Sequence, residues 1–290
     1  MKKSKLAKVL TVSLAALMVF GLASCGGGSG KVSDKDITVI SREEGSGTRD
    51  AFTELTGVLQ DDVDKTVDTA EISNSTSVVT QSVAGNDAAI GYISLGSLDD
   101  TVKAVKVDGV EATVDNIKSG DYKIQRPFNI VTKGEVKELP ADFIKFIMSK
   151  DGQKIIEDEG YISVNDNAEA YKASGLKGSI TLAGSTSVSP VMEVLADKYK
   201  ELNSGVTIEI QQTGSGAGIQ STTEGVCDIG MASRELKDEE TSQGLKSEEI
   251  ALDGIAVIVN NDSPVTNLTS QQVKDIFTGV SAVWSDVLGE

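Results

Sequence analysis

The stretch ITLAGSTSVSP, residues 180–190, joins an apolar strand-like segment to a helix-like one through a turn of glycine and hydroxyl residues. A helix that begins in such a turn points free backbone N–H groups and hydroxyls beyond its N-terminus. TGSGAG at residues 213–218 and REEGSGT at residues 42–48 repeat this design, and each follows an apolar segment. A single glycine and serine loop is usually only a turn. Three of them at strand-to-helix junctions, one with an arginine, predict a receptor for a small oxyanion.

Short apolar segments alternate with longer amphipathic ones along most of the chain. This alternation predicts an α/β fold with parallel sheets covered by helices on both faces. The strand candidates are residues 37–41, 90–94, 102–107, 128–132, 179–182, 206–211, 229–232 and 255–259. The helix candidates are residues 48–55, 76–85, 141–149, 150–159, 189–202, 218–224 and 270–277. Because ligands of such folds bind at the carboxyl ends of strands, we expect all three loops at one site.

The first residues have the pattern of an export signal. Lysines up to Lys8 precede an apolar run at 9–22, which is too short for a comfortable membrane span, and LASC follows at 22–25. The pattern resembles a lipoprotein signal peptide over residues 1–24, which implies cleavage before Cys25 and a lipid on Cys25. Residues 25–35, with GGGSG at 26–30, then form a flexible tether. An ordinary secretory peptide is the alternative.

The composition argues against several classes of function. The chain has no histidine, which removes serine–histidine catalysis and the commonest metal ligand. Its other cysteine, Cys227, lies in the apolar run 226–232 and is expected in the core. The acidic residues are scattered over amphipathic stretches, so we expect no metal and no cofactor. A net charge of −17 argues against nucleic acid and anionic membrane surfaces. It does not exclude an anion in a buried site, because exposed charges are screened beyond roughly 8–10 Å.

At these motifs the chain resembles the high-affinity phosphate-binding lipoproteins of ABC-class phosphate importers, which have the type 2 periplasmic-binding-protein fold. ITLAGSTSVSP is similar to the opening strand, loop and helix of that family. TGSGAG and CDIGMASRE at 227–235 are similar to its second and third motifs, and REEGSGTR at 42–49 to its phosphate loop. Further similarity lies in GYI at 91–93, residues 122–133 and 143–161, ALDGIAVIVN at 251–260, LTSQQVKDIFTG at 268–279 and Trp284.

The order of these segments differs from that of the family. In the family the segment ending near Trp284 runs directly into the REEGSGT loop, whereas here that loop comes first. We therefore interpret the chain as circularly permuted, with the new junction in the polar stretch 166–177. Two truncated neighbours joined by accident are the alternative, but each family segment occurs once. The resemblance then implies one lobe over residues 121–260 and another over 36–120 plus 261–290, connected near 120–127 and 259–264.

The resemblance implies that one phosphate binds between the lobes. The implied binding residues are Arg42, Ser46, Gly47 and Thr48 from one lobe and Thr186, Ser187, Ser215, Gly216 and Ser233 from the other. The arginine would supply a charge-assisted contact, and the glycines would let the backbone approach the anion closely. The alternative for Arg42 is a surface ion pair with Glu43 or Glu44.

One position departs from the family pattern. Some members carry an aspartate after the serine of the third motif, where it accepts a proton from the ligand and so rejects sulfate, but this chain has Arg234. Glu44 or another carboxylate would then have to supply the acceptor. Arg234 either contacts the anion or pairs with Asp238, and the sequence leaves both open.

We therefore expect a monomeric lipoprotein, anchored on the extracellular face of the cell membrane through Cys25. It would pass inorganic phosphate to the permease subunits of an ABC importer and catalyse nothing. The alternatives are a sensory or adhesion lipoprotein with the same fold, a receptor for another oxyanion such as sulfate or molybdate, and a phosphate-ester hydrolase. The hydrolase is disfavoured by the missing histidines and by the lack of a metal-ligand cluster in the sequence.

Overall fold

The computed structural model describes residues 31–289. The predicted signal peptide, Cys25 and the first part of the tether lie outside the described residues, so the lipoprotein leader stays a prediction. Within the described part of the chain, no helix has both the length and the apolar character that crossing a membrane requires.

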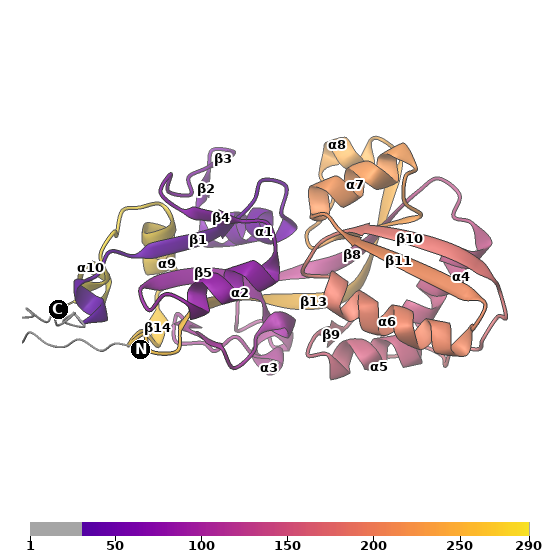
Figure 1. The fold of residues 1–290 in the computed structure, drawn as a ribbon, viewed down its shortest axis with the longest axis horizontal. Coiled ribbons are helices and arrows are strands. Elements are labelled where there is room, and N and C mark those ends of the chain that lie inside the picture. The colour runs from indigo at the N-terminus through magenta and orange to yellow at the C-terminus, as the bar shows by residue number, and fades with distance from the viewer. Residues whose placement is uncertain (1–30, 290) are drawn as a thin grey trace, which may run out of the picture. The chain divides into compact units, whose positions relative to one another are not determined.

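In the described part of the chain, ten strands form one hydrogen-bonded sheet, ordered β11, β10, β12, β8, β13, β5, β1, β4, with β6 and β9 attached to β13. Two large hydrophobic cores occupy its two ends, which appear left and right in Figure 1. We call the cluster around Phe52, Tyr92 and Trp284 the first core, and the cluster around Phe143 and Tyr199 the second core. The mixed sheet and the helices packed on it make a two-domain α/β fold.

The first core is built from four sheet strands, five helices, two short strand pairs and two 3-10 turns. Its strands are β1 (Thr38–Arg42), β4 (Glu71–Ser73), β5 (Ala89–Ser94) and β6 (Val102–Ala104). The helices are α1 (Gly47–Thr56), α2 (Thr76–Ala84), α3 (Val114–Lys118), α9 (Ser270–Phe277) and α10 (Trp284–Leu288). The smaller elements are η1 (Val32–Asp34), β2 (Leu59–Gln60), β3 (Val63–Asp64), η2 (Leu95–Ser97), β7 (Lys106–Val107) and β14 (Asn267–Leu268).

The second core is built around β10 and the strands on either side of it. Its strands are β8 (Gln125–Lys133), β9 (Ile162–Ser163), β10 (Gly178–Gly184), β11 (Val206–Gln212) and β12 (Ile229–Ala232). The helices are α4 (Glu138–Ile147), α5 (Lys150–Asp158), α6 (Ser189–Leu202), α7 (Ser215–Glu224) and α8 (Asp238–Thr241). Helix α6 shows why the sequence folds this way, because Val191, Met192, Leu195 and Tyr199 recur at helical spacing and are all fully buried.

A single long strand, β13 (Leu245–Asn260), serves both cores. Its first part pairs with β8 and its last part with β5, antiparallel in both cases. The expectation of parallel sheets therefore holds only for part of the sheet, namely the pairs of β10 with β11 and β12 and of β1 with β4 and β5. The antiparallel pairs arise because β8 and β13 run in opposite directions between the cores. We call this region, where Gln125 pairs with Gly254 and Arg126 with Asp253, the crossing.

The two ends of the described chain lie side by side on the first core (Figure 1). Ile37 donates its backbone N–H to Ala282 at 2.8 Å, and Trp284 donates its own to Lys35 at 3.1 Å. The indole of Trp284 is fully buried and donates to Ala88 O at 3.0 Å. The C-terminal helix is thus fixed beside the start of β1.

The stretch 166–177 joins the two halves of the chain and has no helix or strand. It is nevertheless held to the second core through Tyr171, whose ring packs edge-on against Phe146. The hydroxyls of Tyr171, Ser174 and Tyr199 all donate to Asp142 Oδ2. Burial alone would raise the pKa of Asp142, but these three hydrogen bonds outweigh it and lower the pKa.

Candidate functional site

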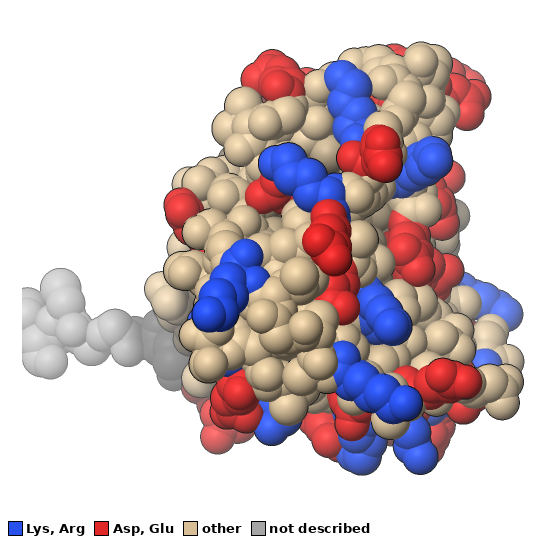
Figure 2. All heavy atoms as spheres, turned by 90° about the vertical axis from the view of Figure 1, so that its right-hand side faces the viewer, with Lys and Arg blue, Asp and Glu red and all other residues tan. Residues whose placement is uncertain are grey.

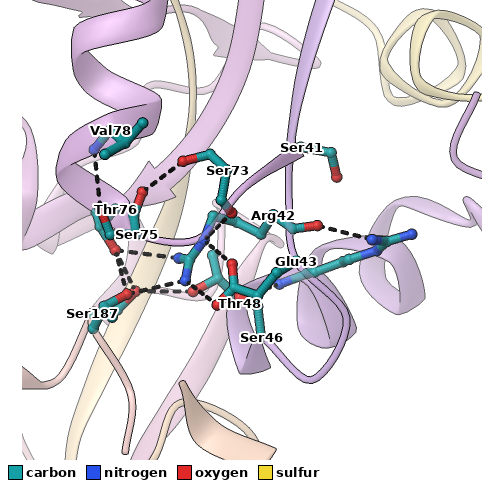
Figure 3. Close-up of polar contacts among 12 residues, drawn as sticks. Ser41, Arg42, Glu43, Ser46, Thr48, Ser73, Ser75, Thr76, Val78 and Ser187 are labelled. Carbon is teal, nitrogen blue, oxygen red and sulfur yellow. Dashed lines mark hydrogen bonds and ion pairs between the residues drawn. The ribbon is translucent and has the colours of Figure 1, made fainter. Parts of the chain in front are cut away.

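Arg42 is the last residue of β1 and the cation of the three glycine loops. It is buried, with 2% of its surface exposed. Its Nε and Nη2 pair with both carboxylate oxygens of Glu43 at 2.8 and 2.9 Å. Nη1 donates to Thr76 Oγ1 at 3.3 Å (Figure 3). Nη2 donates to Thr186 Oγ1 at 3.0 Å. The ion pair with Glu43 that the sequence left open is therefore present, with Arg42 buried and the Glu43 side chain partly exposed. The guanidinium faces hydroxyls from both cores.

The next turn of chain begins α1. Ser46 is the N-cap, and its hydroxyl accepts the backbone N–H of Arg49 at 3.4 Å. Thr48 lies in the first turn, and its hydroxyl is hydrogen-bonded to that of Ser187 at 2.9 Å. Gly47 leaves no room for a side chain, because a Cβ there would lie 2.6 Å from Ser215 Oγ and 2.7 Å from Ser233 Oγ. The close approach of the backbone at Gly47 to a bound anion stays a prediction.

The second core supplies hydroxyls from the ends of β10 and β12 and from the start of α7. The hydroxyl of Ser233 is hydrogen-bonded to those of Ser185 and Ser215, at 3.0 and 3.3 Å. Gly216 donates its backbone N–H to Gly45 O at 2.9 Å, which joins α7 to the loop before α1. All nine residues expected to bind the anion therefore lie at strand ends, in the turns after them or in the first turns of helices that meet between the cores.

Sequence reasoning missed Thr76. It opens α2 after the N-cap Ser75, and its hydroxyl lies 3.3 Å from Thr186 Oγ1 and 3.1 Å from Ser187 Oγ. The signal was the run SNSTS at 73–77, a fourth hydroxyl-rich junction between a strand and a helix. It was overlooked because the strand before it, β4, is short and the run contains no glycine.

We call the buried group of Arg42, Thr48, Thr76, Ser185, Thr186, Ser187, Ser215 and Ser233 the hydroxyl cluster. The N-termini of α1, α2 and α7 open onto it, so their free N–H groups add partial positive charge to that of the arginine. Hydroxyls can donate to an anion or accept from a protonated one. The chemistry available here is the binding of a small oxyanion.

Glu44 and Arg234, the two residues considered for ligand selectivity, lie outside the hydroxyl cluster. Glu44 is exposed. Arg234 donates from Nε to Asp50 Oδ2 at 2.9 Å and from Nη1 and Nη2 to Glu240 at 2.8 Å each. Burial lowers the pKa of Arg234, but these carboxylates outweigh it and raise that pKa. Its partners are thus Glu240 on the second core and Asp50 on α1 of the first, rather than Asp238.

The described residues also bear on metal binding and on the environment of Cys227. Between residues 31 and 289, no group of three or more cysteine, aspartate or glutamate side chains is arranged to hold a metal ion. Cys227 is buried, as expected, and burial raises the pKa of its thiol. On the face that the second core presents in Figure 2, acidic and basic side chains are interleaved rather than gathered by sign.

Comparison with known proteins gives a consistent result. The family model described as a PBP superfamily domain matches residues 28–151 and 169–290. The phosphate-binding protein PstS 2 of Streptococcus agalactiae serotype V is 52% identical over 294 residues, which cover 99% of both chains. The crystal structure of a phosphate-binding protein of a phosphate ABC transporter, from Streptococcus pneumoniae TIGR4, is 48% identical. It superimposes with a TM-score of 0.71 and covers 87% of this chain and 100% of that one.

A more distant relative matches over a shorter length. The phosphate-binding protein PstS of Bacillus subtilis is 35% identical over 144 residues, which are 49% of this chain and 46% of that protein. Similarity over nearly the whole length is thus found with the streptococcal proteins. On these matches, the chain belongs to the PstS family of phosphate-binding proteins.

Proposed function

We propose that this protein captures inorganic phosphate between its two cores and delivers it to the permease subunits of an ABC importer. The observation that carries the proposal is the position of Arg42. This buried guanidinium is hydrogen-bonded to Thr76 of the first core and Thr186 of the second. An anion held by both cores stabilises the form in which they are closed over it, which is the signal that a transport receptor needs.

The proposed ligands are the nine residues expected from the sequence, with Thr76 added. Arg42, Ser46, Gly47, Thr48 and Thr76 come from the first core, and Thr186, Ser187, Ser215, Gly216 and Ser233 from the second. Hydrogen bonds to charged groups contribute about 1.5–3 kcal/mol each before ordering costs, so micromolar affinity, about −8 kcal/mol, needs only a few of them.

The relatives are phosphate-binding transport proteins rather than enzymes, and we propose that this chain is a monomer and also catalyses nothing. Sulfate and molybdate are the competing ligands. Glu44, the carboxylate expected to accept a proton from phosphate and so to reject sulfate, lies outside the hydroxyl cluster, and so does Arg234. Glu43 is a carboxylate near the cluster, but it is paired with Arg42. A sensory role would use the same binding chemistry, and the uptake test below separates it from transport.

Calorimetry tests the binding function. The mature protein is unfolded and refolded to remove carried-over ligand, then titrated with phosphate, arsenate, sulfate, molybdate and a phosphate monoester. We expect one phosphate per chain, and Arg42→Ala should weaken its binding by about 1.5–3 kcal/mol. No heat and no thermal stabilisation in millimolar phosphate would refute the proposal. Phosphate uptake by cells that carry Arg42→Ala tests the importer role, since a pure sensor leaves the uptake rate unchanged.

We also propose that a lipid on Cys25 anchors the protein outside the cell membrane. The support is the LASC pattern at 22–25 and the glycine-rich tether after it. Cys25→Ser should move the protein from the membrane fraction to the soluble fraction, or leave it unprocessed, without changing its phosphate affinity. Equal membrane association of both forms contradicts the anchor.

Finally, we propose that the chain is a circular permutant of the usual family order. The ends of the described chain are hydrogen-bonded neighbours, as a permutation requires. The 144-residue match to the Bacillus subtilis protein, under half of each chain, is what a colinear comparison of permuted sequences gives.

A further inference from the structure

A buried ion pair lies at the crossing. Arg126 of β8 and Asp253 of β13 are directly opposite each other in the strand register, and each side chain is 1% exposed. Arg126 donates from Nε and Nη2 to Asp253 Oδ2 at 3.2 and 3.1 Å. A buried ion pair is often no more stable than an apolar pair of the same size. Its position next to the hydroxyl cluster suggests a role other than stability.

Hydrogen bonds connect this pair to the hydroxyl cluster. The remaining guanidinium nitrogen of Arg126, Nη1, donates to the backbone O of Ser233 at 3.4 Å. Ser233 is a member of the cluster and is hydrogen-bonded there to Ser185 and Ser215. On the side of the first core, Ser94 donates to Asp253 Oδ1 at 2.9 Å. A continuous path therefore runs from β5 through the ion pair to the cluster.

The charges of the two sites also act on each other. Burial lowers the pKa of Arg126, Asp253 opposes that shift, and the charge of Arg42 adds to it. The two buried guanidiniums thus repel each other across the protein interior, where charges act over longer distances than in water. Tyr122 and Tyr161 also lie within electrostatic reach of Asp253, and burial raises the pKa of both phenols, so they stay neutral.

We propose that Arg126 is a second cation of the anion site, acting on the anion through the field of its charge and through Ser233, and that Asp253 attenuates it. The proposal rests on the proposed phosphate site. An anion bound at the cluster relieves the repulsion between Arg42 and Arg126, so part of the binding energy comes from a residue that does not touch the ligand. Asp253 keeps the unliganded interior close to neutral.

A purely structural role makes a different prediction. If the pair only braced the crossing, loss of either partner would loosen Ser233 and weaken binding. If Arg126 acts by its charge, the two substitutions have opposite effects. Arg126→Gln should weaken phosphate binding at least about tenfold, whereas Asp253→Asn, which leaves the cation uncompensated, should strengthen it about threefold or more.

The experiment is a phosphate titration of the refolded mature protein and these two variants. Tyr122→Phe is the matched control, because it removes a buried hydrogen bond to Ile255 O of the same strand without changing any charge. It should leave affinity within about twofold of the parent. Weakening in both charge variants, or no change in either, overturns the proposal. If the parent itself fails to bind phosphate, the proposed function fails instead.

A further measurement keeps the test decisive if Asp253→Asn does not fold. Arg126→Lys keeps the charge but loses the forked geometry, so it should bind more tightly than Arg126→Gln, and equal affinities overturn the proposal.

Discussion

The hydroxyls of Thr48 and Ser187 meet at 2.9 Å, although 139 positions separate the two residues in the chain. Thr48 begins α1 on the first core, and Ser187 lies just before α6 on the second. The hydrogen bond therefore spans the two cores inside the hydroxyl cluster. A hydroxyl can rotate from one acceptor to another, so each of these groups is held where it can donate to an anion.

Removal of either hydroxyl should weaken phosphate binding. We expect Thr48→Ala and Ser187→Ala each to reduce affinity about ten- to a hundredfold, because a donor to a charged ligand is lost. The control is Thr53→Ala, whose hydroxyl is equally buried but donates to Arg49 O within its own helix. Titration calorimetry on the three variants decides the matter. Losses no greater than that of the control would mean that the pair is only structural.

Gly47→Ala should block binding more than it destabilises the fold. The added methyl would lie 2.6 Å from Ser215 Oγ and 2.7 Å from Ser233 Oγ, so both hydroxyls must leave the positions that they hold in the hydroxyl cluster. We expect a loss of more than about a hundredfold in affinity, with a cost in unfolding free energy of about 1–3 kcal/mol. Gly85→Ala is the control, since its nearest neighbour would be 3.4 Å away. A loss of affinity no greater than that of the control contradicts the steric explanation.

Arg234 offers a test of closure, because its two partners lie on different cores. Asp50→Asn breaks the contact with the first core, whereas Glu240→Gln breaks the contact within the second. We expect Asp50→Asn to weaken phosphate binding about two- to fivefold, an effect that shrinks at high salt, as for a partly exposed ion pair. Glu240→Gln should lower the melting temperature with a smaller change in affinity. The reverse pattern would mean that Arg234 does not stabilise the closed form.

The pH dependence of stability should reveal the contact that holds the stretch 166–177. The pKa of Asp142 is lowered in the folded protein, so its contribution is present above the unfolded value of 3.8 and is lost as the pH falls below it. Asp142→Asn should therefore reduce the free energy of unfolding by about 1–2 kcal/mol at pH 7 and by less below about pH 4. Urea unfolding at both pH values measures this. Asp158→Asn, in an exposed pair with Lys154, is the control and should have little effect.

Restoring the family order tests the permutation. A short glycine and serine link from the C-terminus to the start of β1, with a new opening between residues 174 and 178, should give a protein with the same fold. The change alters only loop-closure entropy, which grows slowly with length. We expect phosphate affinity within a few-fold of the parent. A variant that stays unfolded, or binds only after adding a second chain, would indicate two joined fragments that complete each other between molecules.

The three glycine loops could be predicted from the sequence because their chemistry is local. Glycine and hydroxyl residues after an apolar strand fix the backbone shape and the exposed donors at once. Helix α6 was predicted with the bounds found, since its apolar residues recur at helical spacing. Thr76 could not be found in the same way, because β4 is only three residues long and its first two residues are exposed.

The contacts that sequence reasoning could not reach are long-range ones. Arg234 and Asp50 are 184 positions apart, and nothing in either local sequence specifies the other. The sequence also does not predict the first half of β13. Its segment LKSEEI shows little alternation of apolar and polar residues, and its charges are compatible only with a partly exposed strand. Only the fully buried second half, at 255–259, has the continuous apolar run of an interior strand.

The unbroken course of β13 has a mechanical consequence. In a receptor whose halves are joined by loops, opening is a rotation about the backbone dihedral angles of a few flexible residues. The amide protons of those residues exchange quickly with solvent. Here the joint is a hydrogen-bonded ribbon of β8 and β13, so the halves can separate only by twisting or bending that ribbon as an elastic element. Its resistance opposes any wide opening and returns the halves toward each other. The amide protons of the joint should accordingly be among the slowest to exchange in the molecule.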